Sequence, residues 1–175
     1  MKKKMTGIML LAALFSAVSA QAADNLQFRG NLIIPNCKIN NNQPVEIDWG
    51  DVEIQTIGYK VTNPYLHKSK DISIECPYGY GKPRMKISGT SGGLNHDTLA
   101  TSKIDEGLVI ILGYGQSWDT RNKITLNSEQ EVKDFSLSSG RGVVRLQASL
   151  INTKPIENLT PGEFTAGAAM EFRYQ

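Results

Sequence analysis

The sequence predicts an all-β protein, an antiparallel β-sandwich made of short strands. Two observations carry this prediction: apolar and polar residues alternate with period two in several stretches, and turn-forming Gly, Pro, Asn and Ser residues separate those stretches. Beyond residue 22, no long stretch has the apolar period of a helix. With 175 residues and 40% hydrophobic content, the chain is long enough for one well-packed domain.

The first 22 residues have the pattern of a bacterial-type signal peptide. Residues 2–4 are lysines, an apolar run covers residues 8–18, and Ala20 and Ala22 form an Ala-x-Ala cleavage site. We expect cleavage after Ala22 and export of the mature protein. The apolar run is too short for a transmembrane helix.

The mature protein has no basic excess. The leader contains three lysines, so 16 of the 19 Lys and Arg residues remain against 17 Asp and Glu, and the formal charge falls from +2 to −1. A chain with this balance has no cationic stripe for nucleic acid or for an acidic membrane surface.

The mature part contains two cysteines, Cys37 and Cys76. An exported protein with an even cysteine count usually pairs them, which predicts a disulfide. Closing a loop of roughly 40 residues removes denatured-state entropy equivalent to about 4 kcal/mol in the chain-entropy account.

Residues 162–175 predict a long strand at the end of the sequence, with no later segment to close the sheet beside it. Large side chains stand at both ends of its inward row and small ones in the middle, which leaves a recess that another group must fill. The inward row consists of Phe164, Ala166, Ala168, Met170, Phe172 and Tyr174.

Residues 24–34 predict a second strand with clean alternation. Its apolar face contains Leu26, Phe28, Gly30, Leu32 and Ile34. Pro35 ends the pattern, because proline has no N–H to donate to a ladder.

Further strands are predicted between these two. Residues 108–112 form a continuous apolar run, which is typical of a strand buried on both faces. The other alternating stretches are 45–49 (interpreted as a core strand), 72–76, 85–87 and 144–150, with weaker signals at 124–126 and 132–137.

No catalytic, cofactor-binding or metal-binding residue is predicted. His67 and His96 fall in predicted loops, and His96 beside Asp97 lacks the sequence context of a catalytic triad. Both cysteines are used in the disulfide, so no zinc or iron ligand set assembles. Asp48 and its acidic neighbours lack the spacing of a calcium loop.

A sugar-binding hypothesis would use the tryptophans and the tyrosine-rich turn. The alternation of residues 45–49 assigns Trp49 to the core, whereas Trp118, Tyr78 and Tyr80 stay open for such a role.

Four stretches, in order along the mature chain, resemble chaperone-usher pilins, most closely the minor tip-fibrillum subunits of P-type pili. Residues 25–37 resemble the N-terminal extension of that family as it runs into the first cysteine. Residues 48–51 (Asp-Trp-Gly-Asp), residues 76–78 (Cys-Pro-Tyr), and Gly162 paired with Tyr174 complete the resemblance.

The resemblance implies an incomplete immunoglobulin-like antiparallel β-sandwich that lacks its C-terminal strand and carries an N-terminal donor-strand extension. The implied division is a signal peptide at 1–22, the extension at 23–35 and the pilin domain at 36–175. The missing strand leaves a groove beside the last strand, which a periplasmic chaperone covers first and a neighbour's extension covers later.

The resemblance also assigns roles to residues. The donor strand would use Leu26, Phe28, Gly30 and Leu32, and the acceptor groove on which chaperone- and usher-dependent assembly relies would use Gly162, Phe164, Met170, Phe172 and Tyr174. The expected partners are the periplasmic chaperone, the outer-membrane usher and neighbouring subunits, with no nucleic acid, no small-molecule substrate and no cofactor.

The implied function is structural and noncatalytic: a fimbrial subunit that passes through the periplasm to the cell surface and polymerises by donor-strand exchange. The alternative is a secreted single-domain carbohydrate-binding adhesin, and a secreted hydrolase is a remote third. The sequence leaves open whether the subunit is an adaptor, a repeating tip subunit, a rod subunit or a terminator.

Overall fold

The computed structural model describes residues 27–60, 62, 66–93, 97–118 and 122–175. The predicted signal peptide, Leu26 and His96 lie outside the described residues. The chain falls into two units, Met1–Leu32 and Ile33–Gln175.

The described part of the first unit has no regular secondary structure. Phe28 is 86% exposed and Leu32 is 101% exposed. The strand predicted at residues 24–34 is therefore absent over the described residues 27–34. Apolar and polar residues do alternate in this stretch, but a strand also needs a neighbouring strand to pair with its N–H and C=O groups.

The second unit is built from strands and short 3₁₀ helices. The 3₁₀ helices are η1 (Asn40–Asn42), η2 (Ile54–Thr56), η4 (Ile104–Glu106) and η5 (Ile156–Asn158). The strands are β1 (Lys38–Ile39), β2 (His67–Glu75), β3 (Pro83–Gly89), β4 (Thr98–Ala100), β5 (Leu108–Tyr114), β6 (Asn122–Lys123), β7 (Glu129–Glu131), β8 (Arg141–Asn152) and β9 (Ala168–Tyr174). No helix in the described residues is long and apolar enough to cross a membrane.

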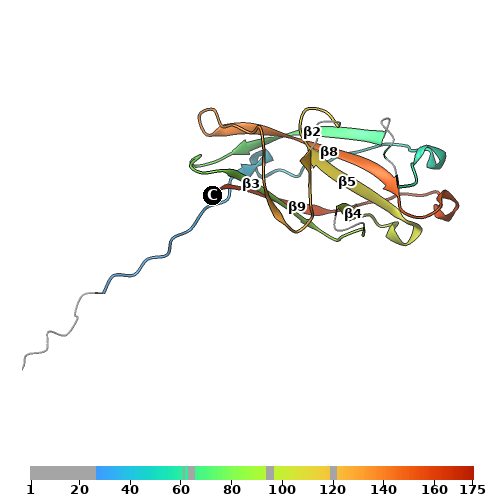
Figure 1. Cartoon of the computed structure of the whole chain (residues 1–175), viewed down its shortest axis with the longest axis horizontal. Coiled ribbons are helices and arrows are strands. Elements are labelled where there is room, and N and C mark those ends of the chain that lie inside the picture. Colours follow the sequence, from blue (N-terminus) through green and yellow to red (C-terminus); the bar gives the residue numbers. More distant parts are fainter. Residues whose placement is uncertain (1–26, 61, 63–65, 94–96, 119–121) are drawn as a thin grey trace, which may run out of the picture. The chain divides into compact units, whose positions relative to one another are not determined.

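These strands form two antiparallel sheets. The larger sheet has the order β1–β2–β8–β5–β4, with β6 also paired to β5, and the smaller one has the order β7–β3–β9 (Figure 1). Adjacent strands in both sheets are antiparallel throughout. The predicted all-β antiparallel sandwich is confirmed.

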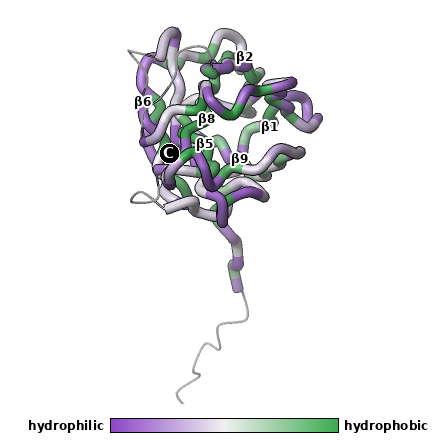
Figure 2. Tube along the Cα trace, turned by 90° about the vertical axis from the view of Figure 1, so that its right-hand side faces the viewer, coloured by the Kyte–Doolittle hydropathy of each residue, from purple (hydrophilic) through white to green (hydrophobic). Residues whose placement is uncertain are grey.

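The core lies between the two sheets. Side chains of β2, β5 and β8 meet those of β3 and β9 in one buried apolar cluster, and Figure 2 shows hydrophobic stretches on β5, β8 and β9. Phe172 of β9 has 0% exposure and stacks on Phe135, with ring centroids 4.8 Å apart. This burial, worth about 25 cal/mol per Å² of apolar area, holds the sheets together.

The strongest periodic signals correspond to real strands. The stretches at 72–76, 85–87, 108–112 and 144–150 lie in β2, β3, β5 and β8. The run at 108–112 is almost entirely buried, as predicted for a strand covered on both faces.

Four further strand predictions need correction. Residues 45–49 are extended and half-buried on alternate positions but belong to no ladder in the described chain, and β9 begins at Ala168 rather than Gly162. Residues 45–49 show the expected alternation without a paired strand, and residues 162–167 are exposed except for the half-buried Phe164. The apolar residues at 124–126 and 132–137 lie beside the short strands β6 and β7 and not within them.

Glu129 and Arg173 form a forked ion pair across the outer face of the smaller sheet, with N–O distances of 2.7 and 3.1 Å. The hydrogen bonds from Arg173 lower the pKa of the Glu129 carboxyl below its ordinary value of 4.5. A carboxyl with a depressed folded-state pKa stabilises the fold above its ordinary pKa, and this stabilisation is lost as the pH falls through the lower folded-state value.

Replacing Glu129 by glutamine is therefore expected to lower the free energy of unfolding at pH 7 by about 1 kcal/mol or less. The difference from wild type should shrink as the pH falls from 4.5 through the lower folded-state pKa of Glu129, where the wild-type carboxyl also becomes neutral. Urea unfolding at pH 7 and pH 3 measures both values, with Glu157→Gln on the exposed η5 turn as the control. A difference that stays constant with pH would contradict this account.

Candidate functional site

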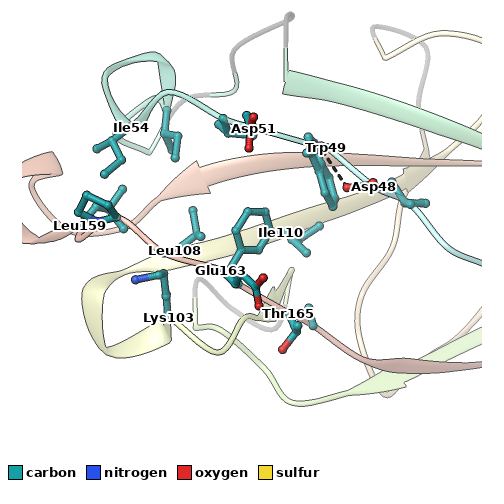
Figure 3. Close-up of a pocket in the computed structure, with 18 of the residues that line it drawn as sticks. Asp48, Trp49, Asp51, Ile54, Lys103, Leu108, Ile110, Leu159, Glu163 and Thr165 are labelled. Carbon is teal, nitrogen blue, oxygen red and sulfur yellow. Dashed lines mark hydrogen bonds between the residues drawn. The ribbon is translucent and has the colours of Figure 1, made fainter.

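An open groove runs between β9 with the residues before it and the segment of residues 44–54 (Figure 3). Its wide hollow has a volume of about 1160 Å³. A narrow hollow of about 180 Å³ adjoins it. The two hollows share the lining residues Val45, Ile47, Trp49, Ile110 and Ala166, so they form one continuous groove.

The floor of the groove is the hydrophobic core itself. Side chains from both sheets line the narrow hollow: Ile72, Ile87, Leu99, Ile110, Leu112, Leu146 and Ala148. An opening of this kind exposes apolar surface that a complete sandwich would cover with another strand.

The first wall is the free edge of β9. One edge of this strand pairs with β3, and toward the other edge the Phe172 carbonyl accepts a hydrogen bond from the Cys37 N–H, at 2.7 Å. Main-chain groups of alternate residues point to the same side of an antiparallel strand, so those of Ala168 and Met170 also point to this edge. They are positioned to pair with an added strand.

The second wall is the segment of residues 44–54. Its apolar side chains, such as Val45 and Ile47, are half-buried toward the groove, and the intervening residues are exposed. Trp49 is fixed by a 2.8 Å hydrogen bond from its Nε1 to the Leu66 carbonyl. Its ring also contacts Phe164 of the opposite wall, with centroids 6.1 Å apart.

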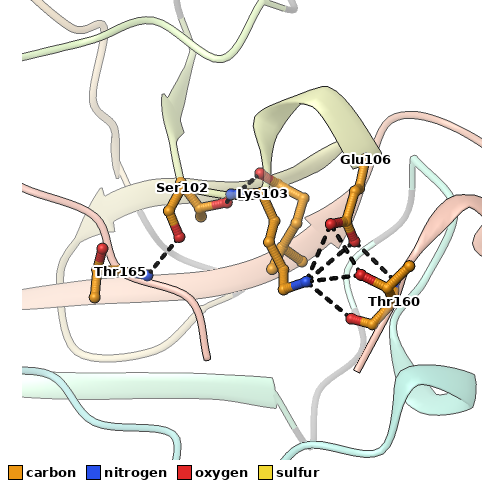
Figure 4. Close-up of polar contacts among 7 residues, drawn as sticks. Ser102, Lys103, Glu106, Thr160 and Thr165 are labelled. Atoms are coloured by element: carbon orange, nitrogen blue, oxygen red, sulfur yellow. Dashed lines mark hydrogen bonds and ion pairs between the residues drawn. The ribbon is translucent and has the colours of Figure 1, made fainter. Parts of the chain in front are cut away.

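A polar cluster anchors the first wall beside the wide hollow (Figure 4). Lys103 Nζ donates to Glu106 Oε1 at 3.1 Å and to the Thr160 carbonyl at 2.9 Å, and the Thr160 N–H donates to Glu106 Oε2 at 2.7 Å. The hydrogen bond from the Thr160 N–H lowers the pKa of the Glu106 carboxyl the most, and the hydrogen bond from Lys103 is the second cause. Ser102 and Thr165 continue the contact through a 3.1 Å hydrogen bond.

The structure separates the predicted acceptor residues into two groups. Gly162 and Phe164 line the wide hollow and Met170 lines the narrow one. Phe172 and Tyr174 line neither hollow, because they are buried in the core, where both rings approach Phe135. Their part in the groove is indirect: they fix the end of β9.

The predicted disulfide is present. Cys37 and Cys76 are bonded, with an S–S distance of 2.03 Å and a sequence separation of 39. The bond joins the end of β2 to the residue that precedes β1, next to the Cys37–Phe172 hydrogen bond. It therefore fixes the end of the groove where residue 37 meets β9.

Several groove residues were not predicted from the sequence. Lys103, Leu159 and Thr160 line the wide hollow, and Glu106 supports them. Lys103 and Glu106 lie 57 and 54 positions from Thr160 along the chain and match no local pattern with it, so only the fold brings them together. The Val45–Trp49 alternation gave a usable signal, but it was interpreted as a core strand rather than as a groove wall.

The aromatic residues considered for sugar binding do not form one surface. Trp118 stacks on His67 at the start of β2, with ring centroids 4.1 Å apart. Tyr78 and Tyr80 follow Cys76 at the other end of that strand. Nine residues of β2 correspond to about 27 Å, too far for one sugar ring to touch both groups.

The described residues contain no group of three or more His, Cys, Asp or Glu side chains that could hold a metal ion. Asp48, one of the acidic residues weighed for calcium, accepts a hydrogen bond from the Gly50 N–H instead. The groove thus offers apolar surface and main-chain hydrogen-bonding groups.

Comparison with known proteins gives concordant matches. The family profile described as "Fimbrial protein" matches residues 26–175. The chain is 30% identical over 179 residues to the fimbrial protein PrsE of Escherichia coli, covering 98% of this chain and 99% of PrsE. It is 34% identical over 110 residues to the fimbrial adapter PapF of Escherichia coli, covering 62% and 64% of the two chains.

A solved structure extends the likeness to the fold. The crystal structure of the P pilus rod subunit PapA matches with a TM-score of 0.60 and 18% identity, over 79% of this chain and 99% of PapA. At this identity the match bears on the fold alone.

Proposed function

Because the chain belongs to the fimbrial protein family, whose members are structural subunits of surface fibres, we propose that it joins its neighbours by exchanged strands and has no catalytic role. Its groove accepts a strand from one neighbour, and its own residues 23–35 enter the groove of another. The observation that carries this proposal is the open apolar groove beside the free edge of β9.

The physical basis is β-strand addition. An inserted strand pairs with the free main-chain groups of β9 and places alternate side chains on the apolar floor. Three buried apolar side chains contribute roughly 1.5 to 3 kcal/mol each, and each main-chain hydrogen bond adds about 0.5 to 1.5 kcal/mol. Such a joint holds subunits together without a covalent bond.

The same groove explains the need for assembly partners. An exposed apolar floor beside a bare strand edge promotes aggregation. We therefore assign the first covering of the groove to a periplasmic chaperone, and the passage of the subunit to the cell surface to an outer-membrane usher. The neighbour's extension then replaces the chaperone strand.

Gly30 provides the test of the donor role. A Cβ atom built at Gly30 meets no heavy atom within 4 Å, so a side chain there does not disturb this chain's own fold. In a neighbour's groove the same side chain would be overpacked, at a cost of about 1 to 3 kcal/mol, and a charge would cost more. Gly30→Arg is expected to weaken subunit joining at least about tenfold.

The measurement is strand exchange between chaperone-bound subunits, followed on native gels. Asn31→Arg is the matched control, since it adds the same charge on the outward face of the extension, where it is not overpacked, and it should exchange at least as well as wild type. If the Gly30→Arg subunit exchanges at the wild-type rate and extent, residues 23–35 are not a donor strand.

A further inference from the structure

We propose that the groove accepts residues 27–34 of a second copy of this chain, and that Arg29 of the donor is recognised by an acidic rim on the wide hollow. This inference rests on the proposed function, because it takes the groove to be a strand acceptor. It makes the chain a repeating subunit.

The acidic rim consists of Glu46, Asp48, Asp51 and Glu163, which all line the wide hollow. The first three come from the second wall and Glu163 from the first, so the rim borders both sides of the hollow, and Figure 3 labels three of the four. In the described part of the chain, no rim carboxylate has a basic side chain within ion-pair distance.

The cation that lines the same hollow does not neutralise the rim. Lys103 Nζ is held by Glu106 and by Thr160, 3.1 Å and 2.9 Å away. The rim thus keeps an uncompensated negative charge beside an apolar floor. An incoming strand that carries a cation on its outer face complements this charge and is steered toward it.

The extension carries such a cation at one position. Arg29 is the sole charged residue in residues 27–34. In an extended strand, Phe28, Gly30 and Leu32 share one face, and Arg29 stands on the opposite face with Gln27 and Asn31. A strand that inserts its apolar face into the groove therefore presents Arg29 on its outer surface, where the rim carboxylates border the wide hollow. The Arg29 side chain is exposed, and its Nη2 donates to Gln27 Oε1 at 3.2 Å.

The length of the extension also matches the length of the groove wall. Residues 27–34 span about 24 Å when extended. The groove wall from Glu163 to Met170 contains the same number of residues and borders both hollows. One donor strand of this length covers the floor of both hollows.

The test uses the chaperone-bound mature subunit and fluorescent synthetic peptides of residues 24–35, which replace the chaperone strand in the groove. The wild-type peptide is expected to bind, and its affinity should fall as salt rises from about 20 to 500 mM, because ions screen the Arg29–rim attraction. The Arg29→Lys peptide should keep this behaviour. The Arg29→Glu peptide should bind about tenfold more weakly at low salt and converge with wild type at high salt.

Acceptor variants complete the test. Glu163→Arg should reduce the preference for the wild-type peptide over the Arg29→Glu peptide, whereas Glu157→Arg, an exposed change outside the groove, should not. Equal binding of both peptides at low salt would overturn the charge recognition. If the wild-type peptide does not bind but the extension of a different subunit does, the occupant is not a second copy of this chain, although the groove is still a strand acceptor. If no extension binds at all, the proposed function itself fails.

Discussion

Replacing Phe172 by alanine is expected to lower the free energy of unfolding by about 3 to 5 kcal/mol. Phe172 has 0% exposure and packs between Phe135 and Tyr174, with ring centroids 4.8 Å and 6.5 Å away. Truncation removes this burial and leaves a cavity that the two neighbouring rings cannot fill without leaving their own contacts. The substitution also removes side-chain packing at the end of β9, where the Phe172 carbonyl accepts a hydrogen bond from the Cys37 N–H.

This loss is measured by urea unfolding of the mature subunit. The wild-type protein and each variant carry the synthetic peptide of residues 24–35 in the groove at the same saturating concentration. Phe172 does not line the groove, so peptide affinity should change much less than stability. Val143→Ala is the matched control, because Val143 is 60% exposed on β8, and it should cost less than about 0.5 kcal/mol. A loss below 1 kcal/mol for Phe172→Ala would show that β9 is not fixed by this contact.

Removing the disulfide by Cys37→Ser and Cys76→Ser together is expected to cost about 4 kcal/mol. The bond closes a loop of 39 residues, and in the chain-entropy account a loop of this length gives that value. The double change avoids leaving a free thiol. It should also loosen the segment after residue 37, which leads into the second wall of the groove.

Two measurements separate these effects. Urea unfolding of the oxidised wild type and the double serine variant gives the change in stability, and donor-peptide affinity reports on the groove. Both single serine variants should lose about as much stability as the double variant, because either one removes the bond. A double variant within 1 kcal/mol of wild type would mean that the loop is already ordered in the unfolded chain.

The strands with partners on both edges could be predicted from the sequence. For β5 and for residues 144–150 of β8, the apolar pattern, the strand and the burial agree, because both edges are paired and most side chains are buried. The resemblance to pilins assigns Gly162, Phe164 and Met170 to the acceptor groove, and the small residues between large ones in the inward row of the last strand predict a recess; these three residues line the two hollows.

The walls of the groove could not be predicted in the same way. Period-two alternation indicates which side chains face inward, but it does not indicate whether a neighbouring strand is present to form hydrogen bonds. Val45 and Trp49 therefore had the pattern of a core strand, although their segment borders an opening. The anchor of the first wall joins Lys103 to Thr160, and no local rule connects residues so far apart in the chain.

The contact between Trp49 and Phe164 has a kinetic consequence. The rings come from opposite walls, and Trp49 lines both hollows, so a strand that fills the whole groove must separate them. An aromatic pair of this kind is worth about 0.5 to 1.5 kcal/mol, which corresponds to a rate factor of up to about ten. If the groove accepts a strand, insertion is expected in two stages, with separation of the Trp49 and Phe164 rings between them. A strand that dissociates faster than the rings separate would then be lost, so the groove would select strands by residence time as well as by affinity.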